Sequence, residues 1–253
     1  MLINENILAM KRSILCMLLF AAVADAFAQN SVPASQPQQI EHIVSVPKTD
    51  LLSPFTKLEI DGQMNVVLKA VAASDVKIVY DTKGCSTSRF KASVNKEGVL
   101  RVEERIDQKR TTVTEVVVYY NTLTDIKILR ANATFENTVD CRILDLSVAG
   151  GATVKIDVKS LDTAVDCTGR SSLVLSGTSR YFRLNASSSA VDARDLSTVS
   201  SIIDASHNAE VRIEVSERLE ATTSTSAKLL YRGKPTIVRE HTSLFGGDII
   251  SID

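Results

Sequence analysis

The sequence predicts an all-β protein whose body is a parallel β-helix, or solenoid, with rungs of about 19 residues after an N-terminal β-rich segment. Three observations predict it. Strand-like alternation recurs from residue 55 onward, and no window there keeps the 3.6-residue period of a helix over three turns. A tract of small residues returns at a nearly fixed spacing. The composition, 44% hydrophobic and 23% charged over 253 residues, is that of a globular protein.

The composition also excludes several classes of function. With 29 basic and 30 acidic residues the net charge is -1, so the chain lacks the basic excess that binds nucleic acid. Three histidines and four cysteines, without a phosphate-loop, dinucleotide-binding or zinc-ribbon pattern, offer little material for metal chemistry. We therefore expect no cofactor, no metal and no nucleic-acid partner.

Residues 1–28 have the features of a secretory signal peptide. Lys11 and Arg12 precede a short apolar run at 14–23, and a small-x-small cleavage site ends at Ala28. The run is too short to span a bilayer comfortably. We expect cleavage after Ala28, no transmembrane helix afterwards, and export to the periplasm, the outer-membrane surface or the medium.

Two differently patterned regions follow a tether. Residues 29–50 are polar and proline-rich and lack apolar periodicity, so they are expected to form this tether. Residues 51–125 are expected to form the N-terminal β-rich part. The expected strands lie at 55–60, 64–68, 76–80, 90–94, 99–102 and 113–120.

Residues 126–253 are expected to form the repeated coils. The small-residue tracts begin at Ser147, Asp166, Asn185, Asp204, Thr222 and Thr242, with one more unit upstream near Ile128. Seven positions into each unit stands an apolar residue: Phe135, Val154, Leu173, Val211, Leu229 and Ile249. Asp192 breaks this row, and Val191 beside it can take the place with a one-residue shift.

The physical interpretation is that one repeat forms one coil. A single coil cannot bury its apolar face, whereas stacked coils about 4.8 Å apart bury a continuous core. Seven coils would be about 34 Å long at that spacing. Small residues suit tight corners, and glycine permits the positive φ that some corners need.

The chain resembles the GIN-domain family, the head domain of autotransporter adhesins found in Bacteroidetes-type exported proteins. The resemblance is carried by Leu58-Glu-Ile-Asp-Gly62, by VVVYY at 116–120 before the small-residue tracts, and by Tyr231-Arg-Gly-Lys-Pro235. It covers residues 51–253. The family implies a right-handed β-solenoid and an adhesin-like or cell-envelope role, and it brings no catalytic residues.

The first positions of the units should stack in one column, which makes them the candidate site. These are Ser147, Asp166, Asn185, Asp204 and Thr222, with Thr242 above them. Such residues often cap turns by accepting backbone hydrogen bonds. The same column could instead form a ligand-face ladder. Asp166 and Asp204 would lie about 9.6 Å apart, near the upper separation in inverting glycosidases, so they are the alternative catalytic pair.

Other polar and thiol groups receive structural interpretations. A second row, Asp157, Ser176, Asp195, Glu214 and Arg232, is expected to form a solvated charged edge. Asp192 and Arg194 are expected to form an ion pair on a local bulge. After removal of Cys16, the three cysteines are either buried small side chains or one disulfide and a free thiol; they are Cys85, Cys141 and Cys167.

The sequence thus favours a non-enzymatic, adhesin-like envelope or surface module that contacts a glycan or a surface protein through a flat solenoid face. A carbohydrate-active enzyme, a polysaccharide lyase or hydrolase using Asp166 and Asp204, is the alternative. A third interpretation is a structural envelope protein that forms homo-oligomers through its open solenoid ends.

Overall fold

Strands make up nearly all of the regular structure in the computed structural model, which describes residues 45–84, 89–105, 112–243 and 245–252. The expected signal peptide and Cys85 lie outside these residues. All of the described residues belong to one compact unit. Among the described residues, helical geometry is limited to the 3-10 kind, at η2 (Ala73–Asp75) and at Arg89. The all-β prediction is confirmed.

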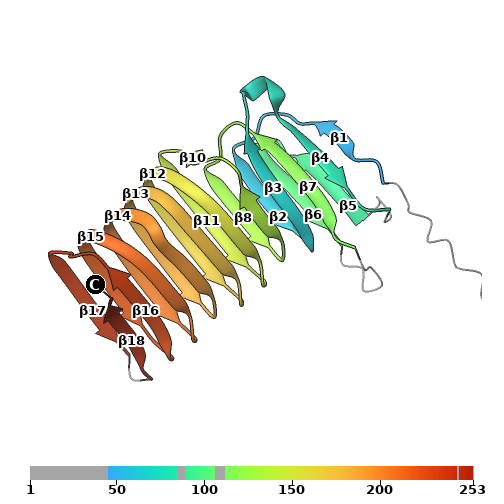
Figure 1. Ribbon diagram of the computed structural model, residues 1–253. Helices are drawn as coiled ribbons and strands as arrows, with labels where there is room; N and C mark the ends of the chain where they lie inside the picture. Colours follow the sequence, from blue (N-terminus) through green and yellow to red (C-terminus); the bar gives the residue numbers. More distant parts are fainter. Residues whose placement is uncertain (1–44, 85–88, 106–111, 244, 253) are drawn as a thin grey trace, which may run out of the picture. The chain divides into compact units, whose positions relative to one another are not determined.

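Eighteen strands of the described residues form one continuous hydrogen-bonded sheet that winds as a solenoid (Figure 1). They are β1 (Lys48–Leu51), β2 (Lys57–Asp61), β3 (Met64–Ala70), β4 (Lys77–Asp81), β5 (Phe90–Val94), β6 (Val99–Glu104), β7 (Thr114–Tyr120), β8 (Asp125–Leu129), β9 (Asn132–Phe135), β10 (Val139–Asp140), β11 (Ile143–Ala149), β12 (Thr153–Thr168), β13 (Ser172–Ser187), β14 (Ala190–Ser206), β15 (Glu210–Thr223), β16 (Ala227–Arg232), β17 (Ile237–Thr242) and β18 (Gly247–Ser251). Strand β1 takes in the last residues assigned to the tether.

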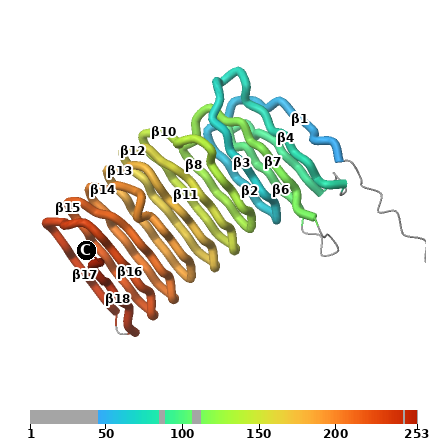
Figure 2. Tube along the Cα trace, viewed as in Figure 1, coloured from blue at the N-terminus to red at the C-terminus, as the bar shows by residue number. Residues whose placement is uncertain are grey.

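Each long strand runs along both sides of the stack. The first part of β12 pairs in parallel with β9 and β10, and its second part, from Asp162, pairs in parallel with β11. The strand therefore turns a corner near Leu161, and β13, β14 and β15 repeat this path one coil further on (Figure 2). The coils differ by 19 residues between β12 and β13, as Asp166 and Asn185 illustrate.

We name the two sides by their strands. The ladder face consists of β2, β6, β8, β11, the second parts of β12–β15 (residues 162–168, 181–187, 200–206 and 218–223) and β17. The opposite face consists of β3, β7, β9, the first parts of β12–β15, β16 and β18. Side chains that point inward from both faces form the core.

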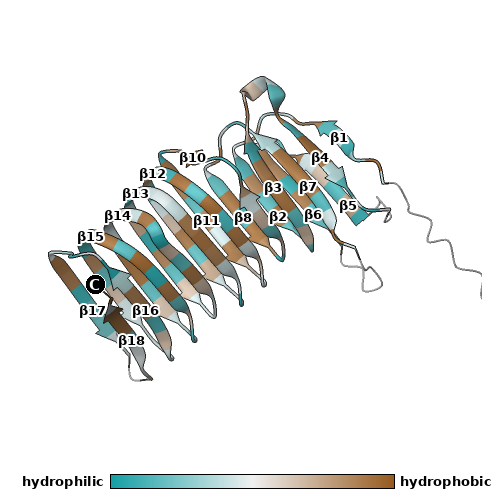
Figure 3. Cartoon of the chain, viewed as in Figure 1, coloured by the Kyte–Doolittle hydropathy of each residue, from teal (hydrophilic) through white to brown (hydrophobic). Residues whose placement is uncertain are grey.

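Period-two alternation explains why each strand has one buried and one exposed side. In β12, Val154, Ile156 and Val158 are buried while Thr153 and Lys155 are exposed. Figure 3 shows the resulting exchange of apolar and polar positions along the strands. Burying such side chains at every coil supplies the main stabilisation of the fold.

The sequence predicts that one apolar residue from each coil lines the interior in a single row. This prediction is confirmed at most positions and is wrong at one end. The consecutive partners of this row in the sheet are Val154, Leu173, Val191, Val211, Leu229 and Ile249. Val191 fills the place that Asp192 leaves. Phe135 is not in the row, because Ala133 is the partner of Val154. Phe135 lies opposite Leu68 and is buried there.

The N-terminal β-rich part extends the same stack in an order that differs from the order along the chain. Strand β2 lies between β6 and β8 and is parallel to both, and β3 lies likewise between β7 and β9. Beyond them, β4 pairs antiparallel with β7 and β1, and β5 pairs antiparallel with β6. The antiparallel strands cover the end of the stack that the N-terminal part forms.

Glycine is required where two coils come into close contact. A Cβ placed on Gly177 would lie 2.1 Å from the Val158 carbonyl oxygen, and its φ is +102°. No side chain fits there without moving the neighbouring coil. Polar residues take the left-handed conformation at other corners, as Ser188 and His207 do with φ of 52° and 53°.

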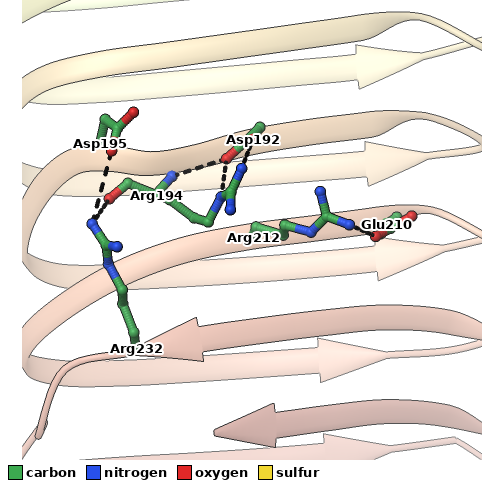
Figure 4. A network of polar contacts seen from close by, with 6 residues as sticks. All are labelled: Asp192, Arg194, Asp195, Glu210, Arg212 and Arg232. Atoms are coloured by element: carbon green, nitrogen blue, oxygen red, sulfur yellow. Dashed lines mark hydrogen bonds and ion pairs between the residues drawn. The ribbon is translucent and has the colours of Figure 1, made fainter. Parts of the chain in front are cut away.

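Asp192 points outward because Val191 before it takes the inward place opposite Leu173, and β14 bulges just after Asp192. The register with β13 shifts between Val174 and Ser176, so that Asp195 lies opposite Ser176. Arg194 donates two hydrogen bonds to the Asp192 carboxylate, of 2.9 and 2.6 Å, which confirms the expected ion pair (Figure 4).

The bulge also interrupts the second polar row. Glu214 pairs with Ser197 rather than with Asp195, so the expected continuous row is wrong at this step. Arg232 joins the two segments across the bulge, because it donates to Glu214 at 2.7 Å and to the Arg194 carbonyl at 2.6 Å.

The two cysteines of the described residues are free thiols. Cys167 is buried in the core and Cys141 is partly buried, so no disulfide joins them. Burial raises the pKa of both thiols, which keeps them protonated.

Candidate ligand-binding face

The polar column predicted from the sequence lies in register on the outside of the ladder face. Each coil contributes one residue, and the sheet pairs them consecutively as Ser147, Asp166, Asn185, Asp204 and Thr222. Asp166, Asn185 and Asp204 are exposed. The residue above Thr222 is His241, not Thr242, because the last coil is one residue out of step with the expected spacing.

The column continues below Ser147 into strands that the repeat did not include. Lys127 pairs with Ser147, Glu59 pairs with Lys127, and Arg101 pairs with Glu59. Arg101 donates to the Glu59 carboxylate at 2.7 Å, and Lys127 lies 3.6 Å from the other oxygen. The Arg101 hydrogen bond lowers the pKa of Glu59. This lower segment is therefore satisfied by its own ion pairs.

The upper segment leaves polar groups available. Asn185 Nδ2 donates to Asp166 Oδ1 at 2.8 Å across one coil. The carboxylate of Asp204, on the other side of Asn185, makes no hydrogen bond or ion pair with any residue that the structure describes. The three side chains thus present carboxylate and amide groups at intervals of about 4.8 Å.

A shallow hollow of about 170 Å³ lies beside this segment on the ladder face. It is lined by Asp162, Tyr181, Phe182, Arg183, Ser200 and Ile202. Tyr181 and Arg183 stand on β13 four and two residues before Asn185, so all three point outward from one strand. The sequence pattern alone does not reveal the hollow, although the alternation in β13 places Tyr181 and Arg183 on the outside.

A second hollow, of about 240 Å³, lies on the opposite face. Its charged lining residues are engaged with neighbours: Asp192 with Arg194, and Glu210 with Arg212 (Figure 4). Val174, Val191 and Leu173 are among the apolar lining residues. Because its charged side chains already form ion pairs with neighbouring residues, fewer of them are available to bind a polar ligand.

The alternative catalytic pair, Asp166 and Asp204, occupies two coils of the column with Asn185 between them. Neither residue lines one of the two hollows. Within the described ranges, no three histidine, cysteine, aspartate or glutamate side chains gather as metal ligands. The helical structure found there includes no segment of the length and hydropathy needed to cross a membrane.

Comparison with known proteins gives one family. A family model with the description "Putative auto-transporter adhesin, head GIN domain" matches residues 54–235. A search of curated proteins finds no match.

Three solved structures share the fold. A "putative adhesin" from Bacteroides fragilis superposes with a TM-score of 0.76 at 16% identity, covering 82% of this chain and 97% of its own. One from Parabacteroides distasonis gives 0.66 at 14% identity, with coverage of 82% and 97%. One from Parabacteroides merdae gives 0.60 at 15% identity, with coverage of 81% and 96%. At these identities the likeness concerns the fold.

Proposed function

We infer the function from two facts: the chain belongs to the family of auto-transporter adhesin head GIN domains, and its ladder face carries an exposed polar column. We propose that it is an exported envelope or surface module, adhesin-like and non-enzymatic. Its ladder face contacts a glycan or protein, and the contact is centred on Asp166, Asn185 and Asp204.

The observation that carries the proposal is the register of these three residues. Parallel strands hold their side chains at a fixed interval of about 4.8 Å, and the buried core behind them keeps the strands rigid. A rigid grid of donors and acceptors suits a polymer whose own groups repeat. It binds along a surface and needs no deep pocket.

The polar groups of this segment are also available. The Asp204 carboxylate has no hydrogen-bond or ion-pair partner among the described residues, and Asn185 uses one amide hydrogen on Asp166 and keeps its side-chain carbonyl oxygen for a partner. A surface whose polar groups already form hydrogen bonds or ion pairs with each other gains less free energy when a ligand binds. The lower segment of Glu59 and Arg101 is paired in this way, so we assign the contact to the upper segment.

Binding of the purified protein to arrays of glycans and envelope proteins, and to intact bacterial and host cells, tests the proposal. The test variant is Asp166→Ala with Asp204→Ala. The matched control is Lys155→Ala with Lys228→Ala, which also removes two exposed charges but from the opposite face. We expect the test variant to lose at least about tenfold in affinity and the control to bind as the wild type.

Equal binding by the two double variants, or no binding by the wild type, would overturn the proposal. Chromatography of any bound glycan after incubation addresses the enzymatic alternative. Shortened products that depend on Asp166 and Asp204 would establish a lyase or hydrolase in place of the binding module.

A further inference from the structure

The hollow of about 170 Å³ beside Tyr181 has the composition of a small ligand subsite. Pockets for drug-sized molecules measure about 300–1,000 Å³, so this hollow accepts one small ring. Because it is open on the outside, that ring can remain part of a longer chain. It adjoins the polar column, since Tyr181 and Arg183 share a strand with Asn185.

Tyr181 supplies an aromatic surface to the hollow. The residue is 46% exposed, whereas Tyr120 and Phe182 are buried; Phe245, near the last coil, is the other aromatic residue that the described ranges expose strongly. The Arg180 guanidinium lies 5.7 Å from the centre of the Tyr181 ring, close enough for a cation–π contact. Exposed tyrosines bind amphipathic partners, because the ring is apolar and the hydroxyl is polar.

The arginines near the hollow have no carboxylate partner among the described residues, whereas most arginines elsewhere on the stack do. Among the described residues, seven arginines form ion pairs with Asp or Glu: Arg101, Arg130, Arg194, Arg212, Arg218, Arg232 and Arg239. Arg183 in the hollow, Arg180 beside Tyr181, and Arg142 one coil below form no ion pair with a described residue. The Arg142 carbonyl accepts the backbone N–H of Asp162 at 3.1 Å, so the backbone of Arg142 lies beside a residue that lines the hollow.

An unpaired guanidinium group such as that of Arg183, which lines the hollow, recognises an anion, and a planar carboxylate fits the guanidinium fork with two hydrogen bonds. Asp162 and Ser200 line the same hollow and are suited to hydroxyl groups, because a carboxylate accepts hydrogen bonds and a serine does both. The hollow thus combines an aromatic ring, an arginine and hydroxyl-binding groups around a space for one ring. The ligand that fits this combination is a sugar acid.

We propose that this hollow is a subsite for a carboxylate-bearing pyranose ring of a glycan. The apolar side of the ring contacts Tyr181, its carboxylate pairs with Arg183, and its hydroxyls bond to Asp162 and Ser200. Neutral neighbouring sugars of the chain extend over Asn185 and the polar column, where the Asp166 and Asp204 carboxylates accept hydrogen bonds from their hydroxyls. This inference rests on the proposed function of the ladder face and names the class of ligand that the face takes.

The test uses oligosaccharides in which a carboxylate-bearing sugar has neutral neighbours, and their methyl esters. A hyaluronan hexasaccharide and a sialylated trisaccharide are each titrated by calorimetry into the purified protein, beside the esterified form of the same molecule. The ester keeps the shape of the sugar and removes its charge. We expect at least one free acid to bind at least about tenfold more tightly than its ester, and to bind more weakly as salt rises.

Three variants test the individual contacts, and a fourth is their control. Arg183→Gln and Tyr181→Ala are expected to weaken binding of that free acid at least about tenfold. Tyr181→Phe keeps the ring and is expected to stay within about threefold of the wild type. Lys155→Gln is the matched control for charge, because Lys155 is an exposed residue of β12 on the opposite face. It is expected to bind as the wild type with the same melting temperature.

The outcomes separate this inference from the proposed function. If a ligand found on the arrays needs Asp166 and Asp204 but binds equally to the Arg183→Gln and Tyr181→Ala variants, the subsite is wrong and the proposed function stands. Preference for the esters, or no binding of any carboxylated sugar, also overturns the subsite. If no ligand depends on the ladder face at all, both are wrong.

Discussion

The amide nitrogen of Asn185 donates a 2.8 Å hydrogen bond to the carboxylate of Asp166 on the neighbouring coil. Asn185 pairs with Asp204 on its other side, so a neutral residue separates two carboxylates that lie two coils apart. Like charges in register on adjacent strands would repel each other. The order of residue types in the column therefore keeps two anionic groups on one face without direct repulsion between neighbours.

The change Asn185→Asp tests this arrangement. It would place three carboxylates in consecutive coils about 4.8 Å apart and remove the amide donor. We expect a loss of about 1–2 kcal/mol in the free energy of unfolding at pH 7 and low salt, reduced by added salt. Urea unfolding at low and high salt measures it.

The control for this prediction is Asn132→Asp. Asn132 lies on the opposite face between Asn65 and Thr153, and its amide donates to Asn65 at 3.1 Å. The same substitution there meets no charged neighbour in register. A salt-dependent loss of equal size at both positions would contradict the electrostatic explanation.

Gly177→Ala is expected to destabilise the stack strongly. Its Cβ would lie 2.1 Å from the Val158 carbonyl oxygen, which belongs to the adjacent coil. We expect a loss above about 2 kcal/mol, because the clash adds to the cost of a positive φ. Gly151→Ala is the comparison, since Gly151 has a φ of +80° and nothing within 4 Å of its Cβ position. It should lose only about 1 kcal/mol. Similar losses in thermal unfolding of the two variants would contradict the close approach of the coils.

Leu173→Ala and Val174→Ala compare the two sides of one strand. Both residues belong to the opposite face of the stack. Leu173 points inward and is fully buried, whereas Val174 points outward and is 39% exposed. We expect the Leu173 change to cost about 2–5 kcal/mol and the Val174 change to stay within about 0.5 kcal/mol of zero. Chemical denaturation measures both. A reversed order would mean that the strand is turned over.

Titration of Asp192 tests the bulge of β14. The two hydrogen bonds from Arg194 lower the pKa of Asp192 below its ordinary value of 3.8. Since the pKa is lower in the folded state, this pair stabilises the fold above pH 3.8. The contribution is lost as the pH falls through the lowered value.

Arg194→Gln is therefore expected to raise the pKa of Asp192, as followed by NMR of the carboxyl carbon. The stability difference between this variant and the wild type should shrink below pH 3.8. An unchanged pKa in the variant would show that the ion pair is absent in solution.

The sequence predicted the middle of the stack well because two physical constraints act together there. The 19-residue spacing sets the length of a coil, and period-two alternation decides which side of each strand is buried. A slip of one residue would bury Asp166 and expose Val165, so the register of the polar column follows from the apolar pattern.

The same reasoning failed where the coil length changes. Extending the repeat to its ends predicts Phe135 in the apolar row and Thr242 in the polar column, but Ala133 and His241 occupy those positions. The insertion of β2 between β6 and β8 has no periodic signal, because these strands are far apart in the sequence. The Tyr181 hollow depends on which outward side chains remain unpaired, and only the structure gives that information.

Carboxyl labelling of the complex tests the central claim most directly. The purified protein is treated with a carbodiimide and an amine in the absence and presence of the glycan or surface protein that binds best on the arrays, and labelled residues are quantified by mass spectrometry. We predict that the ligand protects Asp166 and Asp204 and leaves Glu210 and Asp248 of the opposite face labelled as before. Protection of Glu210 and Asp248 with full labelling of Asp166 and Asp204 would contradict the account.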